Sequence, residues 1–89
     1  MPEIPIVELR WSDEVDIKIA RRGLSRLDVY EAIVLDPNHE AYWVEDEEHG
    51  RRLYARGVSE SNPKEVLAYL DPLNEFDGIW SVRTAWRLD

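Results

Sequence analysis

Arginine and tyrosine alternate with small or apolar residues in segment 51–58, whose residue types are typical of a β-strand. Because successive strand side chains point to opposite faces of a sheet, Arg52, Tyr54 and Arg56 share one face, and the apolar residues between them face the core. Guanidinium groups bind phosphate oxygens, and a phenol can stack on a base or transfer a proton. The pattern predicts an anion-binding sheet face, with Arg52 and Tyr54 as catalytic candidates and Arg56 as an RNA-binding candidate.

The last strand-like segment, 79–88, carries the same kind of alternation. A period of two places Arg83 and Arg87 on one face, and the opposite, mainly apolar face is formed by Trp80, Val82, Thr84, Trp86 and Leu88. We predict that Arg83 and Arg87 complete the catalytic set if this segment lies near segment 51–58. The alternative is that these arginines are ordinary solvent-facing side chains paired with carboxylates, which contributes little energy.

Two further side chains are predicted to contact RNA at the margins of this face. Tyr69 lies in another strand-like segment, and His49, whose imidazole can transfer protons near neutral pH, borders the first arginine strand. The alternative for His49 is an exposed side chain without a catalytic role. The consecutive acids at 45–48 lack the spacing of a calcium loop and indicate a solvated turn, so no metal and no cofactor is expected. The four tryptophans are predicted to lie in the core.

The elements that position these side chains are indicated by their end signals. Ser12 and Ser25 are typical helix N-caps, and Asp28 follows Ser25 as in a capping box. The two helices should end at Gly23 and before Pro37. Strands are predicted at 4–11, 40–45, 51–58, 64–71 and 79–88. Because short connections favour antiparallel neighbours, we predict an α+β fold in the order β-α-α-β-β-β-β, with two helices on one face of an antiparallel, mostly meander sheet.

Composition limits the class of protein. With 89 residues, 44% of them hydrophobic, the chain is expected to form a single domain over residues 1–89 around one modest core. It has no cysteine, no long apolar run and no secretion signal, so we expect a cytoplasmic protein without a membrane partner. The net charge is −8, with 13 acids and 5 bases in residues 1–50 and 6 of each in 51–89. Such a charge disfavours non-specific binding to a phosphate backbone.

Several short motifs resemble those of the BrnT-type toxins of bacterial toxin–antitoxin systems. They are Leu-Arg-Trp-Ser-Asp-Glu at 9–14, Ala-Arg-Arg-Gly-Leu-Ser at 20–25, Glu-Ala at 31–32, Asp-Pro at 36–37, Arg-Arg-Leu-Tyr-Ala-Arg-Gly at 51–57 and Thr-Ala-Trp-Arg at 84–87. At the corresponding places the family has Trp-Asp-Glu, Lys-His-Gly, a helix leading to Asp-Pro, Glu-Arg-Trp-x-x-x-Gly and Ser/Thr-Ala-Arg with a basic residue after it. Arg22 stands where the family has histidine, and Trp86 stands where it has arginine.

The resemblance implies a RelE-like fold and cleavage of mRNA, with inhibition by an antitoxin protein. It matches Arg52 to the strand arginine of the family and Arg87 to the basic residue after Ser/Thr-Ala-Arg, both for stabilising phosphate charge. Tyr54 as a proton-transfer or stacking group rests on its residue type alone. The alternative function is a catalytically inactive toxin-fold protein that acts as an acidic protein-interaction module. A homodimer formed through a sheet edge is a further candidate assembly.

Overall fold

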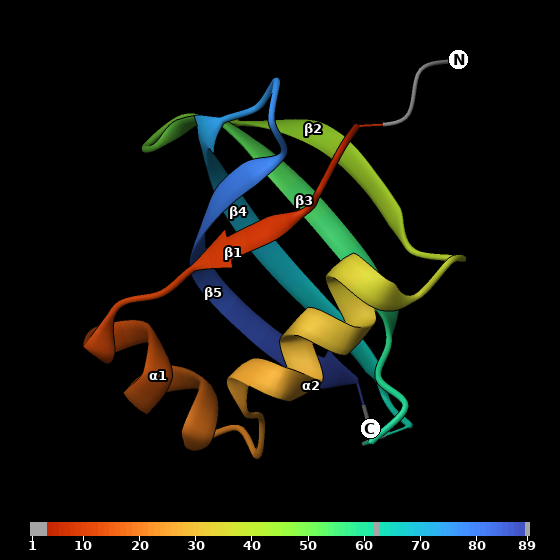
Figure 1. Cartoon of the computed structure of the whole chain (residues 1–89). Helices are drawn as coiled ribbons and strands as arrows, with labels where there is room; N and C mark the ends of the chain where they lie inside the picture. Colours follow the sequence, from red (N-terminus) through yellow and green to blue (C-terminus); the bar gives the residue numbers. More distant parts are fainter. Residues whose placement is uncertain (1–3, 62, 89) are drawn as a thin grey trace.

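The chain folds as an α+β protein in which a five-stranded sheet carries its helices on one face (Figure 1). The computed structural model describes residues 4–61 and 63–88. In chain order the elements are β1 (Glu8–Arg10), α1 (Asp13–Ala20), α2 (Arg26–Tyr30) continued by the π-helical turn η1 (Glu31–Leu35), β2 (Glu40–Asp46), β3 (Gly50–Val58), β4 (Glu65–Asn74) and β5 (Ile79–Leu88). The predicted α+β class is confirmed.

The strands lie in the order β1-β5-β4-β3-β2, and the last four in sequence form an antiparallel meander. β1 instead pairs with β5 in parallel, with Glu8 opposite Ile79 and Arg10 opposite Ser81. The sheet is therefore mixed, and the prediction of an antiparallel sheet is wrong at this edge. The helices carry the chain across the sheet from the β1 edge to the β2 edge, which leaves β1 beside the last strand (Figure 1).

Local contacts fix where the helices begin and end. Ser12 Oγ accepts a hydrogen bond of 3.3 Å from the first turn of α1. Ser25 and Asp28 form the predicted capping box, in which Asp28 N donates to Ser25 Oγ at 3.2 Å and Ser25 N donates to Asp28 Oδ2 at 3.0 Å. After α1 the chain turns at Gly23, whose φ of 76° favours glycine. The π-helical turn gives way to extended backbone at Asp36, where the sequence predicted the end.

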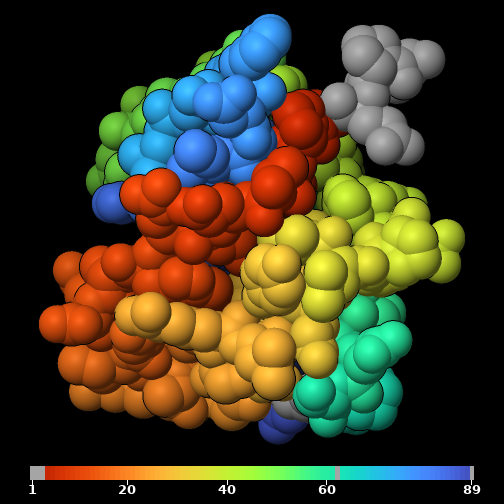
Figure 2. Space-filling view, viewed as in Figure 1, coloured from red at the N-terminus to blue at the C-terminus, as the bar shows by residue number. Residues whose placement is uncertain are grey.

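The core lies between the helices and the covered face of the sheet. Its most buried side chains are Ile19, Val29, Ala32, Ile33, Leu53, Ala55, Val66, Ala68, Leu70, Trp80, Val82 and Ala85. Gly57 lets β3 approach η1, because a Cβ there would lie 1.9 Å from the carbonyl oxygen of Ala32. The indole N–H of Trp80 donates to the Pro5 carbonyl at 2.8 Å and so ties the N-terminal segment to the core. Figure 2 shows the helices and this segment closing the same side of the molecule.

The pairing of β4 with β5 contains an extra residue in β5. Tyr69 lies opposite Thr84, whereas Leu70 lies opposite Val82, so Arg83 forms a β-bulge. One inserted residue reverses the faces of all side chains that follow it. The strict alternation predicted for segment 79–88 therefore holds only up to the bulge.

The bulge moves Trp86 out of the core. Ala85 is fully buried on the covered face, while the neighbouring indole of Trp86 contacts Tyr69 on the opposite face, with ring centroids 5.6 Å apart. The prediction that the four tryptophans lie in the core is wrong for Trp86. It holds for Trp80, which is 0% exposed, while Trp11 and Trp43 are partly buried and pack against the core.

Candidate functional site

The sheet face opposite the helices, which we call the open face, carries Arg52, Tyr54 and Arg56. The residues between them, Leu53 and Ala55, are 0% exposed on the covered face, so the predicted alternation holds along β3. β4 lies between β3 and β5, so the arginines of the two strands are not direct neighbours. Any contact between the two sets must pass across β4.

A carboxylate on β4 joins Arg52 to Arg83. The Nε atom of Arg52 lies 3.2 Å from Asp71 Oδ1, and the Nε atom of Arg83 lies 3.2 Å from Asp71 Oδ2. The side chain of Arg52 is only 12% exposed, whereas that of Arg83 is 52% exposed. The structure thus brings these two predicted site residues together, but around an acid rather than around an empty anion site.

Arg56 is paired in the same way at the other end of β3. Its Nε atom lies 3.1 Å from Glu65 Oε1 and 3.5 Å from Glu40 Oε2. The open-face arginines Arg52, Arg56 and Arg83 are therefore matched by Asp71, Glu40 and Glu65. Taken together they form a charge-balanced surface and not the positively charged clamp that the sequence predicted.

Aromatic rings cross the open face in a continuous line, which we call the aromatic row. The ring centroids of Tyr42 and Tyr54 are 5.1 Å apart, those of Tyr54 and Tyr69 are 5.4 Å apart, and those of Tyr69 and Trp86 are 5.6 Å apart. Burial is the largest cause that raises the pKa of Tyr54 above its ordinary value of 10.0. Its phenol is therefore protonated at neutral pH and does not act there as a general base, which is a constraint on its predicted catalytic role.

A shallow depression lies at the free edge of β5, beyond the residues that pair with β1. It is lined by Arg22, Thr84, Trp86 and Arg87, and we call it the β5-edge depression. The Nη1 atom of Arg22 donates to Thr84 Oγ1 at 2.9 Å and to the carbonyl oxygen of Ala85 at 3.0 Å. These bonds fix the guanidinium of Arg22 against the edge of β5 beyond its pairing with β1, where no other strand among residues 4–61 and 63–88 pairs with it.

Arg87 reaches this depression because the chain leaves room for it at Gly23. A Cβ on Gly23 would lie 3.2 Å from the Nη2 atom of Arg87. The bulge at Arg83 turns Arg87 to the side of the helices, away from Arg52 on the open face. The prediction that Arg87 joins the open-face arginines is therefore wrong, and its guanidinium lies instead beside the segment that carries Arg22.

Arg22 is the site residue that the analysis of strand faces missed. Its side chain comes from the end of α1, so no strand periodicity could have indicated it. The one available signal was its place in the 20–25 motif, at the position where the BrnT-type family has histidine. Because Arg22 departs from that motif, neither the motif nor the alternation pattern predicted it as a site residue.

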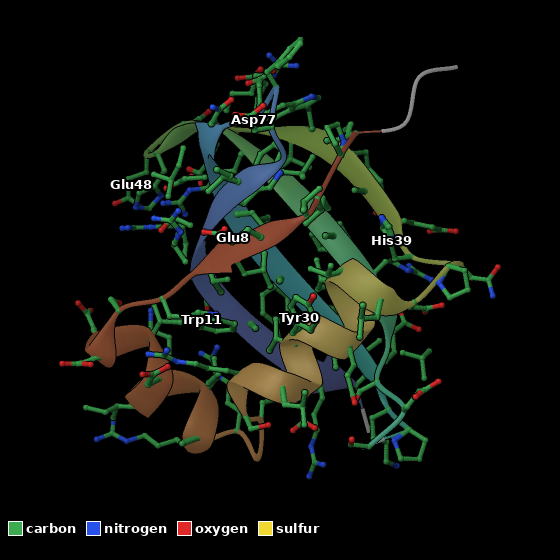
Figure 3. The ribbon with its side chains drawn as sticks, in the orientation of Figure 1. Glu8, Trp11, Tyr30, His39, Glu48 and Asp77 are labelled. Carbon is green, nitrogen blue, oxygen red and sulfur yellow. The ribbon has the colours of Figure 1, made fainter. Side chains whose placement is uncertain are left out.

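The remaining predicted residues lie apart from the depression or on the aromatic row. His49 lies in the turn between β2 and β3, with Nδ1 3.2 Å from Asp46 Oδ2. This turn is at the end of the sheet opposite the C-terminal end of β5 (Figure 1), and its neighbour Glu48 lies at the periphery of the molecule (Figure 3). The structure does not bring His49 to the guanidinium groups of the depression. Tyr69, by contrast, lies at the centre of the open face and contacts Trp86.

Three findings complete the description of the site. Within residues 4–61 and 63–88, no group of three or more acidic or histidine side chains is arranged to hold a metal ion. The helices of this same part of the chain are too short and too polar for any of them to cross a membrane. Comparison of the chain with protein-family models, with curated proteins and with solved structures finds no match.

Proposed function

We propose that this chain is a divergent homologue of the BrnT-type toxins, with a RelE-like fold, that cleaves RNA at the β5-edge depression. The observation that carries the proposal is the meeting of two motif segments at one place. Arg22 belongs to segment 20–25, and the other lining residues belong to segment 84–87, although Arg22 and Thr84 are 62 residues apart in sequence. At this depression Thr84 and Arg87 match the family motif, whereas Arg22 and Trp86 stand where the family has histidine and arginine.

The depression combines groups that phosphate chemistry on RNA requires. Arg22 and Arg87 supply guanidinium groups, which bind phosphate oxygens through paired hydrogen bonds. The oxygens that Arg22 contacts, those of Thr84 and Ala85, are neutral, so these contacts do not compensate its positive charge. The indole of Trp86 offers a surface on which a base can stack. A phosphate and the adjoining base could therefore be held at the same time.

Cleavage at this site would begin with attack of a ribose 2′-oxygen on the adjacent phosphorus. The bond from phosphorus to the 2′-oxygen forms, the bond to the 5′-oxygen breaks, and a 2′,3′-cyclic phosphate remains. The 2′-hydroxyl proton passes to water, and the leaving 5′-oxygen takes a proton from water. The guanidinium groups stabilise the charge that develops on the other phosphate oxygens. None of the four lining residues is a carboxylate or a histidine, so we expect a slow enzyme that depends on charge stabilisation.

The test is incubation of the purified protein with several end-labelled mRNAs at low ionic strength. We expect products that end in a 2′,3′-cyclic phosphate, and a rate about 10²–10³-fold lower for Arg87→Ala, as for removal of one group that stabilises a transition-state charge. Arg22→Lys should retain more activity than Arg22→Ala, because it keeps the charge but loses the planar fork. Arg10→Ala is the matched control, because it removes an exposed arginine from β1 and should leave the rate unchanged.

Two results would overturn the proposal. One is the absence of cleavage at high protein concentration. The other is cleavage that persists at the wild-type rate in an Arg22→Ala/Arg87→Ala variant, which would assign the activity to another site or to a contaminant. Thermal unfolding of each variant separates loss of chemistry from loss of fold.

A catalytically inactive interaction protein is the second candidate function. The pairing of Arg52, Arg56 and Arg83 with carboxylates favours it, as does the net charge of −8. A basic partner, such as an antitoxin-like chain, would be attracted by charge complementarity. Saturable, salt-sensitive binding of a basic peptide by a protein that cleaves no RNA would support this candidate. Cleavage that depends on Arg87 would remove it.

The proposed homodimer through a sheet edge meets an electrostatic obstacle at β2. This strand is an outer strand of the sheet, and its acids include Glu40, Glu45 and Asp46. Antiparallel pairing of two copies of β2 would bring like charges together, which is how edge strands commonly resist association. Sedimentation that shows a stable dimer unaffected by salt would contradict this reasoning.

A further inference from the structure

The aromatic row is continuous with the β5-edge depression through a shared residue. Trp86 lines the depression and also contacts Tyr69 in the row. Tyr42, at the far end of the row, is 47% exposed, and the side chains between them are partly exposed. The reaction proposed above uses only Trp86 of this row. The sequence predicted a stacking or proton-transfer role for Tyr54 and contact with RNA for Tyr69, and it predicted no role for Tyr42.

We propose that the aromatic row is a base-stacking track for single-stranded RNA, running from Tyr42 across the sheet to a phosphate held at the β5-edge depression. The inference rests on the proposed function and extends it to the class of substrate. Every base has a face that can stack on an aromatic ring, so such a track accepts unpaired RNA with little preference for sequence. Paired bases are already stacked within a duplex, which the row would not accept.

The geometry of the row suits this role. One ring comes from each of β2, β3, β4 and β5, and neighbouring centroids are 5.1 to 5.6 Å apart. The row therefore crosses the strands, which are themselves spaced by about 4.8 Å. Aromatic side chains on the open face of a small four-stranded sheet are known to stack roughly two or three bases. The length of this row is sufficient for a comparable number.

Guanidinium groups flank the row without making it strongly basic. Arg52 and Arg56 lie two residues to either side of Tyr54 on the same face of β3. Their ion pairs, and that of Arg83, use the Nε atom, which is one of several nitrogen donors of a guanidinium. The side chains of Arg56 and Arg83 are 42% and 52% exposed, so their guanidinium groups can also meet phosphate oxygens or base edges, whereas the side chain of Arg52 is only 12% exposed. Because carboxylates balance these charges, stacking rather than counterion release should dominate the affinity, and the dependence on salt should be shallow.

The shared residue Trp86 favours RNA over a protein as the occupant. An occupant must present a flat ring to Trp86 and an anion to Arg22 and Arg87 within a short distance. A nucleotide carries a base and a phosphate on one sugar and meets both requirements. An acidic side chain supplies the anion but carries no ring, and the net charge of −8 repels an acidic peptide and RNA alike.

The experiment measures binding without cleavage. Fluorescently labelled 2′-O-methyl oligouridylate and oligoadenylate, which lack the attacking hydroxyl, are titrated with protein and followed by anisotropy, beside a duplex of the same length. We expect both single strands to bind, the duplex to bind weakly, and Tyr42→Ala to lower the affinity for single strands about tenfold. Phe76→Ala is the matched control, because it removes a ring that is 92% exposed in the turn between β4 and β5 and should change nothing.

The outcomes separate this inference from the proposed function. An affinity unchanged by Tyr42→Ala and Tyr54→Ala, or equal binding of duplex and single strand, would overturn the stacking track even if cleavage depends on Arg87. Binding that depends on Tyr42 in a protein that never cleaves RNA would support the track and remove the ribonuclease. A basic peptide that competes for the row with higher affinity than RNA would assign the open face to a protein partner and overturn the inference.

Discussion

Replacing Gly57 by alanine should be severely destabilising, although it adds a single methyl group. The added Cβ would lie 1.9 Å from the carbonyl oxygen of Ala32 and 2.8 Å from its carbonyl carbon, distances below the 3.0 Å that real Cβ atoms respect. The obstacle is backbone of η1, which cannot rotate away as a flexible side chain could. Either η1 or β3 must therefore move.

The size of the effect follows from this geometry. Overpacking a tight interior typically costs about 1–3 kcal/mol. A clash with backbone in a densely packed interior belongs at the upper end, so we expect about 3 kcal/mol. For a domain of this length the total stability is roughly 5–13 kcal/mol. The melting temperature should then fall by about 12–24 °C.

Thermal and urea unfolding, followed by circular dichroism, measure this loss. Gly50→Ala is the matched control. Gly50 has a φ of 77° that strains alanine, but apart from Gly50 and its two chain neighbours no described residue has an atom within 4 Å of the added methyl. The Gly50→Ala control should lose only about 1–2 kcal/mol of stability, which is the cost of placing alanine in that backbone conformation. A Gly57→Ala protein that unfolds at the same temperature as Gly50→Ala, or above it, would refute the reasoning.

Two further predictions concern local stability. Hydrogen bonds, chiefly from the backbone N–H of Ser61, lower the pKa of Glu31 below its ordinary value of 4.5, and those chiefly from Asn38 lower the pKa of Asp36 below 3.8. As the pH falls, the unfolded chain takes up protons before the folded chain does. The stability from these two carboxylates is therefore complete above about pH 4.5 and is lost as the pH falls towards the folded-state pKa values. Glu31→Gln should flatten the slope of unfolding free energy against pH, measured by urea titrations at several pH values, and an unchanged slope would contradict the assignment. Ser25→Ala removes the capping box and should cost about 1 kcal/mol, or roughly 4–8 °C in melting temperature; a melt identical to that of the wild type would show that the cap contributes nothing.

Local signals in the sequence were sufficient for the order of the elements and for the faces of β3. The bounds were wrong at two strands, because β1 covers only Glu8–Arg10 of the predicted strand 4–11 and β4 continues to Asn74 beyond the predicted end at 71. The caps at Ser12 and Ser25 depend only on neighbouring residues, so they could be predicted without knowledge of the fold. The same is true of Arg52, Tyr54 and Arg56, because β3 keeps a regular register with both of its neighbours. Alternation is a reliable guide wherever pairing is regular.

The features that local sequence did not predict depend on pairing between strands. The bulge at Arg83 depends on how β5 meets β4, and nothing in the alternating residues of 79–88 indicates it. Its effect was to exchange the predicted faces of Trp86 and Arg87. The neutralisation of Arg52 and Arg83 likewise depends on the position of Asp71 on the strand between them, which follows from register and not from local sequence.

The parallel pairing of β1 with β5 has a consequence for the order of events in folding. Glu8 pairs with Ile79, and Trp80 bonds to Pro5, which is 75 residues away in the sequence. Closing so long a loop is entropically costly, and contacts of this kind slow folding. On the ribosome the first strand can dock only after β5 has been synthesised. A nascent chain released before that point would lack β5 and the indole of Trp80, and its N-terminal segment would have no strand to pair with. Such a chain should be recognised by chaperones and degraded by proteases.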